Sequence, residues 1–371
     1  MAVDILRTIE MLKEALLRDL RDEVDLIFRY GSYLKGTAHK YSDLDISYVP
    51  AHESTWDSIT VLVDDIMIDF YPIHWSQLEL MANFDDISCT VLLESQIVYQ
   101  RSETVAERFR ALPARLRTLQ QPDARPAMLR KAQEIFQGIG YQYYLLRQQA
   151  TVGHQLSCLQ HARNILTGVL HCVMVCNQAC IDTRKLAQVL ALPKLPVGFA
   201  ETVGRVTKAT DPGELLSACE TLLHTTRDLL LAEQQEVQRD ETTFPAVFDA
   251  AYPELKGDLQ HLMLACARQD MFNFNLMSLY HELMVHMAQA FTGIEYSSFN
   301  SLAEYEQDLV ALGFPDLMPY VVARDFAELY RQCRAFDQRL QQFLTEHSVS
   351  LNAFATLDEL QEYLGVDRVQ Q

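Results

Sequence analysis

The segment that most restricts what this chain can fold into spans residues 29–45 and reads RYGSYLKGTAHKYSDLD. The mostly apolar run 24–28 predicts a strand that ends at Gly31, and residues 43–49 predict a second strand. Asp43 and Asp45 are two positions apart, and alternate residues of a strand point to the same face. Two carboxylates beside a glycine turn with exposed backbone N–H groups suit a divalent metal that holds a polyphosphate.

A third carboxylate follows in a predicted hairpin. Residues 59–63 and 66–71 are rich in β-branched and aromatic residues and flank the acidic pair Asp64 and Asp65, which predicts the turn. Asp69 lies within the second, otherwise apolar strand, where a carboxylate needs a cation or hydrogen bonds to offset its desolvation. Asp69 is therefore the best third metal ligand. The alternative is an aspartate on the solvent face of an edge strand.

The rest of the chain is predicted to be helical. Residues 4–22 form an amphipathic helix, and long helical periods run through 103–119, 126–149 and 153–182. Asp211 caps a further helix that extends to about 238, and the prolines between 238 and 253 indicate a boundary. The predicted fold is α+β, with a small mixed sheet domain at 1–102 followed by all-α helical bundle domains at 103–240 and 241–371.

The amino-acid composition restricts the classes of molecule that this chain is expected to bind. The chain has 371 residues with 50 acidic and 31 basic side chains, for a formal net charge of -19. Such a surface repels phosphate backbones, which argues against nucleic acid as the main partner and suits a cationic acceptor, although solubility alone also explains it. The eight cysteines show no zinc-site spacing, and no apolar stretch approaches membrane-spanning length. We expect a cytoplasmic protein that does not contact a membrane.

The spacing of these residues resembles the signature of the DNA polymerase β-like nucleotidyltransferase superfamily. That signature is a Gly-Ser turn, an Asp-x-Asp pair and a third carboxylate on a following strand. Here it is carried by Gly31, Ser32, Gly36, Asp43, Asp45 and Asp69. The local form GSYLKGTAHKYSDLD looks most like the branches that act on small molecules and RNA ends, and the resemblance covers roughly residues 20–100.

The resemblance implies a two-metal phosphoryl transfer. Asp43, Asp45 and Asp69 would hold two Mg²⁺ ions on the triphosphate of ATP or another nucleoside triphosphate. The residues implied in nucleotide binding are Gly31, Ser32, Gly36, Thr37, Lys40 and Ser42. Glycine lets the backbone approach the phosphates and the serines donate hydrogen bonds. Lys40 either pairs with a phosphate or is merely solvated.

A weaker resemblance links the helical part to the C-terminal domain of kanamycin nucleotidyltransferase. In that enzyme a glutamate on the first of these helices is the general base. The aligned position here is Gln137, which cannot accept a proton, but Glu134 lies one turn earlier on roughly the same face. Glu134 is either the base or a solvated helix residue.

Three functions compete. The first is transfer of a nucleoside monophosphate, AMP from ATP, to a hydroxyl of a small molecule that resembles an aminoglycoside. The second is modification of a macromolecule, either a protein that receives AMP or an RNA end that is extended. The third is a catalytically silent nucleotide-binding module, against which the three intact carboxylates argue, because clustered carboxylates repel one another without metal. Residues 254–371 either cover the acceptor cleft or form a homodimer contact.

Overall fold

The computed structural model describes residues 4–52, 58–237, 243–249, 251–270, 279–280, 283, 285–287 and 309–365. The chain divides into two compact units, Met1–Leu230 and Leu231–Gln371. The division into domains at 1–102, 103–240 and 241–371 stays a prediction. Its second boundary, between 238 and 253, lies partly outside the described residues.

A mixed five-stranded sheet forms the N-terminal part of the first unit. Its strands are β1 (Val24–Arg29), β2 (Leu44–Pro50), β3 (Ile59–Val63), β4 (Ile66–Pro72) and β5 (Gln96–Gln100). Their order is β3-β4-β2-β1-β5. Strands β2 and β4 run parallel and the other neighbours antiparallel, which confirms the predicted small mixed sheet followed by helices.

Helices cover both faces of this sheet. Helix α1 (Ile5–Leu20) packs Ile9 and Leu16 against one face, where Leu44, Ile46 and Phe70 are buried. The opposite face carries helices α3 (Trp75–Ala82), α4 (Thr90–Leu93) and α5 (Glu103–Leu119) over a second core. Because side chains alternate along a strand, the residues between those buried under α1 point to the face of α3 and α4.

The predicted hairpin is present, with a turn of two residues. Asp64 and Asp65 have φ angles of 49° and 61°, the left-handed pair of a type I′ turn that matches strand twist. Strand β4 is internal, because β3 pairs with one of its edges and β2 with the other. The alternative that placed Asp69 on an edge strand is therefore wrong.

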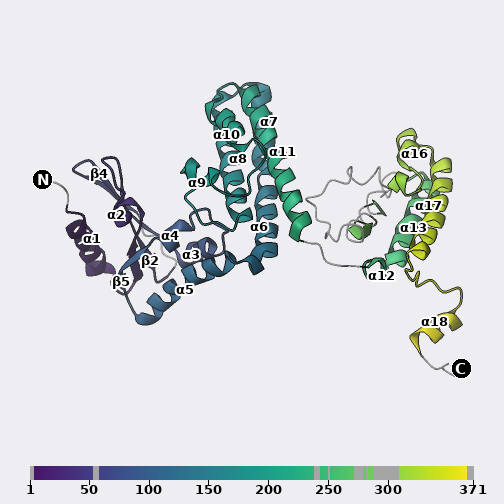
Figure 1. Ribbon diagram of the computed structural model, residues 1–371, viewed down its shortest axis with the longest axis horizontal. Helices are drawn as coiled ribbons and strands as arrows, with labels where there is room; N and C mark the ends of the chain where they lie inside the picture. Colours follow the sequence, from purple (N-terminus) through teal and green to yellow (C-terminus); the bar gives the residue numbers. More distant parts are fainter. Residues whose placement is uncertain are drawn as a thin grey trace. The chain divides into compact units, whose positions relative to one another are not determined.

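A helical bundle completes the first unit, and Figure 1 shows its long helices side by side. The remaining helices of this unit are α2 (Gly31–Lys35), the 3₁₀ turn Pro122–Ala124, α6 (Arg125–Gly138), α7 (Gly140–Val152), α8 (Gln155–Cys176), α9 (Leu186–Leu190), α10 (Phe199–Lys208) and α11 (Pro212–Val237), whose residues after Leu230 belong to the second unit. Asp211 caps α11 as predicted, since its Oδ1 accepts hydrogen bonds from the N–H groups of Gly213 and Glu214.

The helical period predicted over 126–149 is divided between α6 and α7 at Ile139. Ile139 is buried between two glycines and packs on Gly168 of α8, where an added Cβ would lie 2.8 Å from Ile139 Cγ1. The close approach of Ile139 to α8 is a tertiary contact, so the periodicity of 126–149 alone does not reveal the break.

The second unit is helical where it is described. Its helices are α12 (Phe244–Val247), α13 (Ala251–Arg268), α16 (Met318–Ala323), α17 (Phe326–Glu346) and α18 (Leu357–Leu364). Helices α13 and α17 share an apolar core, and Asp337 of α17 accepts a hydrogen bond from the Tyr252 hydroxyl of α13 at 3.1 Å. Among the described residues of both units, no helix has the length and apolarity needed to cross a membrane.

Candidate active site

Two of the three predicted metal ligands lie next to each other in the sheet. Asp45 of β2 is in register with Asp69 of β4. Their chain neighbours pack under α1, so both carboxylates belong to the face of α3 and α4. The Thr60 hydroxyl donates a hydrogen bond to Asp69 Oδ1 at 3.0 Å, and Asp43 is half-buried directly before β2. Parallel pairing of β2 with β4 thus brings the carboxylates together.

The turn at Gly31 fits closely against Asp45. The Tyr30 N–H donates to the Asp45 carbonyl at 3.2 Å, which holds the end of β1 beside the start of β2. Gly31 has a φ of +81°, and a Cβ at this position would lie 1.9 Å from Asp45 Oδ2. Both the conformation and the space require glycine, and the absence of a side chain leaves room for the carboxylate.

The loop that follows α2 is held by its own hydrogen bonds. Gly36, with φ +68°, ends the helix, and the Thr37 N–H donates to the Ser32 carbonyl at 3.0 Å. The buried Ser42 hydroxyl accepts a hydrogen bond from the His39 N–H at 2.9 Å and so closes the loop before β2. Gly36, Thr37 and Ser42 therefore shape the segment that carries Asp43.

Lys40 extends away from this loop into solvent. It is exposed, and its Nζ lies 4.4 Å from the centre of the Tyr41 ring, which is itself 80% exposed. The contact is a surface cation–π interaction. The predicted pairing of Lys40 with a phosphate stays a prediction.

The pKa of the Asp45 carboxyl is shifted by its surroundings. Burial, together with the negative charges of Asp43 and Asp69, raises the pKa of this carboxyl to about 6, against the opposing effect of Arg184 and Lys35. The carboxylates repel one another in a partly desolvated place, which is the condition that a bound cation relieves. The site thus favours a cation or a cation-bound ligand.

The donor set suits Mg²⁺ that arrives with phosphate. Within the described residues, no group of three or more His, Cys, Asp and Glu side chains has the geometry to hold a metal ion by itself. Mg²⁺ is usually held by one or two carboxylates together with substrate phosphates and water, a number of protein ligands that Asp45 and Asp69 could supply. The Ser32 hydroxyl, buried without a hydrogen-bond partner at the start of α2, is a further polar group available beside Gly31.

A cavity of about 450 Å³ opens at this face of the sheet, a volume in the range of small-molecule sites. Its walls come from the sheet, from the segment that contains α3 and α4, and from one loop of the helical bundle. The lining residues are Tyr30, Gly31, Lys35, Asp45, Tyr71, Pro72, Ile73, Gln77, Met81, Asp86, Ile87, Ser88, Thr90, Val91, Glu94, Asp182, Thr183 and Arg184. The bundle therefore contributes residues 182–184 to the cavity.

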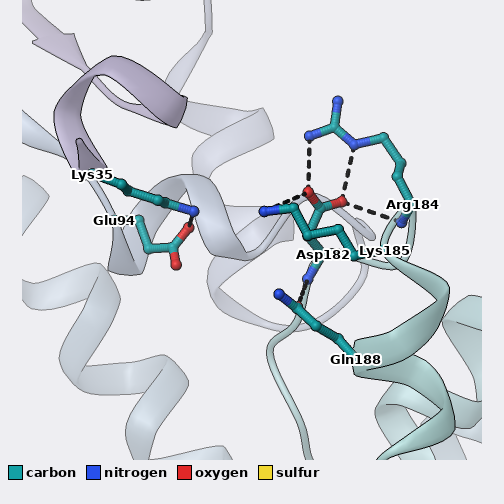
Figure 2. Close-up of polar contacts among 6 residues, drawn as sticks. All are labelled: Lys35, Glu94, Asp182, Arg184, Lys185 and Gln188. Carbon is teal, nitrogen blue, oxygen red and sulfur yellow. Dashed lines mark hydrogen bonds and ion pairs between the residues drawn. The ribbon is translucent and has the colours of Figure 1, made fainter. Parts of the chain in front are cut away.

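Two cations line the cavity, and each is held by an acidic partner outside the predicted metal ligands (Figure 2). Lys35 of α2 pairs with Glu94. The Arg184 Nε donates to Asp182 Oδ1 at 2.9 Å and its Nη2 to Asp182 Oδ2 at 3.3 Å. Burial alone would raise the pKa of Asp182, but the hydrogen bonds and charge of Arg184 outweigh it and leave that pKa below its ordinary value.

Comparison with known proteins identifies the sheet region. Residues 9–74 match the family model of the nucleotidyltransferase domain. This region is a nucleotidyltransferase domain. The matched segment includes Asp43, Asp45 and Asp69, and the match confirms the predicted DNA polymerase β-like nucleotidyltransferase superfamily. The link between the helical part and kanamycin nucleotidyltransferase stays a prediction.

Similarity over the whole chain is faint. A nucleotidyltransferase-like protein from Exiguobacterium sibiricum 255-15 aligns over 69% of this chain and 91% of its own, with a TM-score of 0.36 and 13% identity. No curated protein matches the sequence.

The nucleotidyltransferase cavity includes some predicted residues and adds others. Gly31 and Asp45 line it, whereas Glu134 is exposed on α6 and is not among the described residues of its wall. Sequence reasoning missed Lys35, although it lies four positions after Gly31 and hence on one face of α2. It also missed Arg184, for which no local pattern gives a signal.

Proposed function

We propose that this chain transfers a nucleoside monophosphate from a nucleoside triphosphate, AMP from ATP in the simplest case, to a hydroxyl of a small molecule. One observation carries the proposal: Asp45 and Asp69 stand in register on neighbouring parallel strands, with the Gly31 turn packed against Asp45 at the cavity wall. That arrangement supports binding of a cation and a polyphosphate at one point, in a domain of the nucleotidyltransferase family.

The transfer step needs space at the cavity wall, positive charge and a proton acceptor from the chain. The acceptor oxygen forms a bond to the α-phosphorus while the bond from that phosphorus to the bridging oxygen breaks, and pyrophosphate leaves. Gly31 leaves room for the Asp45 carboxylate at the cavity wall, and Lys35 and Arg184 supply positive charge. The acceptor proton passes either to Glu134, the base predicted from the sequence, or to a carboxylate of the cavity wall.

Asp43, Asp45 and Asp69 would hold Mg²⁺ in this proposal. When bound, Mg²⁺ stabilises the attacking and leaving oxygens of an in-line displacement. Asp45 is partly desolvated and is repelled by the negative charges of Asp43 and Asp69. Binding of a cation would relieve this repulsion.

The acceptor that fits best is a cationic small molecule. Four carboxylates line the cavity, and Asp86 Oδ1 accepts a backbone hydrogen bond from the Ser88 N–H at 2.7 Å. The net charge of -19 disfavours RNA at long range. An amino sugar of the aminoglycoside type meets both conditions.

An acceptor panel tests the proposal. With Mg²⁺ and ATP, we expect the purified chain to release pyrophosphate when amino-sugar acceptors are added and to attach labelled AMP to them. Parallel reactions contain purified RNA, protein fractions and each of the other nucleoside triphosphates. Labelling of protein or RNA alone would contradict the small-molecule assignment, and no transfer from any triphosphate would contradict the function itself.

The variant Glu134→Gln decides between the two roles of Glu134. A general base contributes about 10²–10⁴ to the rate, so a base on α6 would show a loss of that size in kcat. Because Glu134 is exposed and lies outside the described cavity wall, we expect kcat to stay within about twofold of the unaltered enzyme. Gln137→Ala, one turn further along the same helix, is the matched control for loss of a surface side chain.

A further inference from the structure

The loop at residues 182–184 is the described contribution of the helical bundle to the nucleotidyltransferase cavity. Asp182 organises this loop. Its carboxylate accepts hydrogen bonds from the Arg184 N–H at 3.2 Å and from the guanidinium, and its own N–H donates to Gln188 Oε1 at 3.2 Å (Figure 2). The loop is thus tied to α9 and presents Arg184 in a defined orientation.

The guanidinium of Arg184 is held but accessible. The Arg184 side chain is 89% exposed, whereas that of Asp182 is 16% exposed, so the pair lies at the surface of the cavity with the arginine on the outer side. Exposed ion pairs contribute little to stability, because water screens the charges. Arg184 can therefore leave Asp182 for a more highly charged anion at little cost in free energy. Its planar guanidinium is already oriented for bidentate binding.

The position of Arg184 relative to the metal-ligand face indicates which anion it meets. Arg184 lines the same cavity as Gly31 and Asp45, so the guanidinium and a predicted metal ligand border one space. Lys35 of α2 lines that cavity from the sheet region. A polyphosphate bound through a metal ion at Asp45 would therefore have two positively charged side chains in the same cavity, Lys35 from the sheet region and Arg184 from the helical bundle.

We propose that Arg184, oriented by Asp182, is the polyphosphate-binding residue that the helical bundle supplies to the nucleotidyltransferase site. Binding of a triphosphate turns the guanidinium from Asp182 to the phosphate oxygens and ties the bundle to the substrate. Arg184 is a binding residue and Asp182 is its positioning residue. The inference rests on the proposed function, because it takes a triphosphate as the ligand of this cavity.

The neighbouring Lys185 provides a matched control. Its Nζ lies 3.8 Å from Asp182 Oδ2, so it shares the partner and the sign of charge, yet it is not among the described residues of the cavity wall. A general electrostatic effect would weaken binding equally in Lys185→Ala and Arg184→Ala. A direct contact affects Arg184→Ala alone.

Calorimetric titration with Mg²⁺ and inorganic tripolyphosphate, with ATP and with AMP tests the proposal. For tripolyphosphate and ATP we expect Arg184→Ala to raise Kd about tenfold or more, Arg184→Lys to recover part of the loss and Lys185→Ala to stay within about twofold. Asp182→Asn should give an intermediate loss, and the Kd of AMP should not change in any variant.

The outcomes separate this inference from the function it rests on. If the unaltered chain binds ATP and transfers AMP while Arg184→Ala binds tripolyphosphate as tightly, the role of Arg184 is refuted and the proposed function stands. Equal losses in Lys185→Ala and Arg184→Ala also refute it. If the unaltered chain binds no triphosphate, both proposals are overturned. Thermal unfolding of each variant verifies that a loss of binding is not a loss of fold.

Discussion

Replacement of Asp45 by asparagine is expected to abolish transfer and, in the same variant, to stabilise the metal-free protein. Asparagine has the shape of aspartate but no charge, so it removes a metal ligand and also removes the repulsion with Asp43 and Asp69. Loss of a ligand to a catalytic metal is worth several kcal/mol of transition-state stabilisation, which corresponds to a fall in kcat of about 10³-fold.

The gain in stability follows from the pKa of Asp45. Burial and the neighbouring carboxylates raise this pKa from 3.8 to about 6 in the folded protein. Between these two values the folded state holds the proton more firmly than the unfolded state, so stability falls as pH rises through this window and the cost is complete above pH 6. Because Asp45 is partly exposed and water screens the charges, the difference corresponds to about 1–2 kcal/mol at neutral pH. Asp45→Asn avoids this cost, and its advantage disappears near pH 4.

Thermal unfolding of the metal-free protein between pH 4 and pH 8 measures this effect. We expect Asp45→Asn to unfold several degrees higher than the unaltered chain at pH 7.5, and addition of Mg²⁺ to stabilise the unaltered chain alone. Asp65→Asn is the control, because Asp65 is exposed in the β3–β4 turn, and asparagine tolerates its left-handed conformation. An Asp45→Asn variant that is less stable at pH 7.5 would show that the carboxylate supports the fold instead of serving a cation.

The parts of this structure that the sequence predicts are those determined by neighbouring residues. The left-handed turn at Asp64 and Asp65 is encoded by two acidic residues between β-branched runs, and the start of α11 by Asp211 before proline and glycine. The Asp45–Asp69 pair was predictable for the same reason, since strand periodicity gives the face of each carboxylate. Its exact register comes from the parallel pairing of β2 with β4, which no local pattern specifies.

The parts that sequence reasoning missed depend on contacts between distant segments. Arg184 reaches the cavity because the loop after α8 lies beside α4, and Lys35 was overlooked in favour of Lys40, which has the same charge but extends to solvent. A lysine in a polar loop carries no sign of its direction. Lys35 lies within α2 and Lys40 lies in the loop after it, so the two are distinguished only by where the helix ends, at Gly36.

The substitution Gly31→Ala is expected to cause the second large effect. At a φ of +81° alanine is strained, at a cost of about 1 kcal/mol, and its Cβ would lie 1.9 Å from Asp45 Oδ2. Either the carboxylate or the turn must move, and a displacement of about 1 Å at a catalytic group costs on the order of 10²-fold in rate. We therefore expect a folded protein with transfer reduced at least about 10²-fold and with weaker stabilisation by Mg²⁺.

Gly153→Ala separates the clash at Gly31 from the conformational cost. Gly153 has a φ of +74° at the end of α7, and a Cβ there would meet nothing within 4 Å. Alanine is strained by the left-handed backbone in both variants, so the unfolding temperature of each should fall. The transfer rate of Gly153→Ala should not change. Circular dichroism and thermal unfolding establish the fold of each variant before its activity is compared. Equal transfer rates in the two variants would mean that the contact between Gly31 and Asp45 does not position the carboxylate for catalysis.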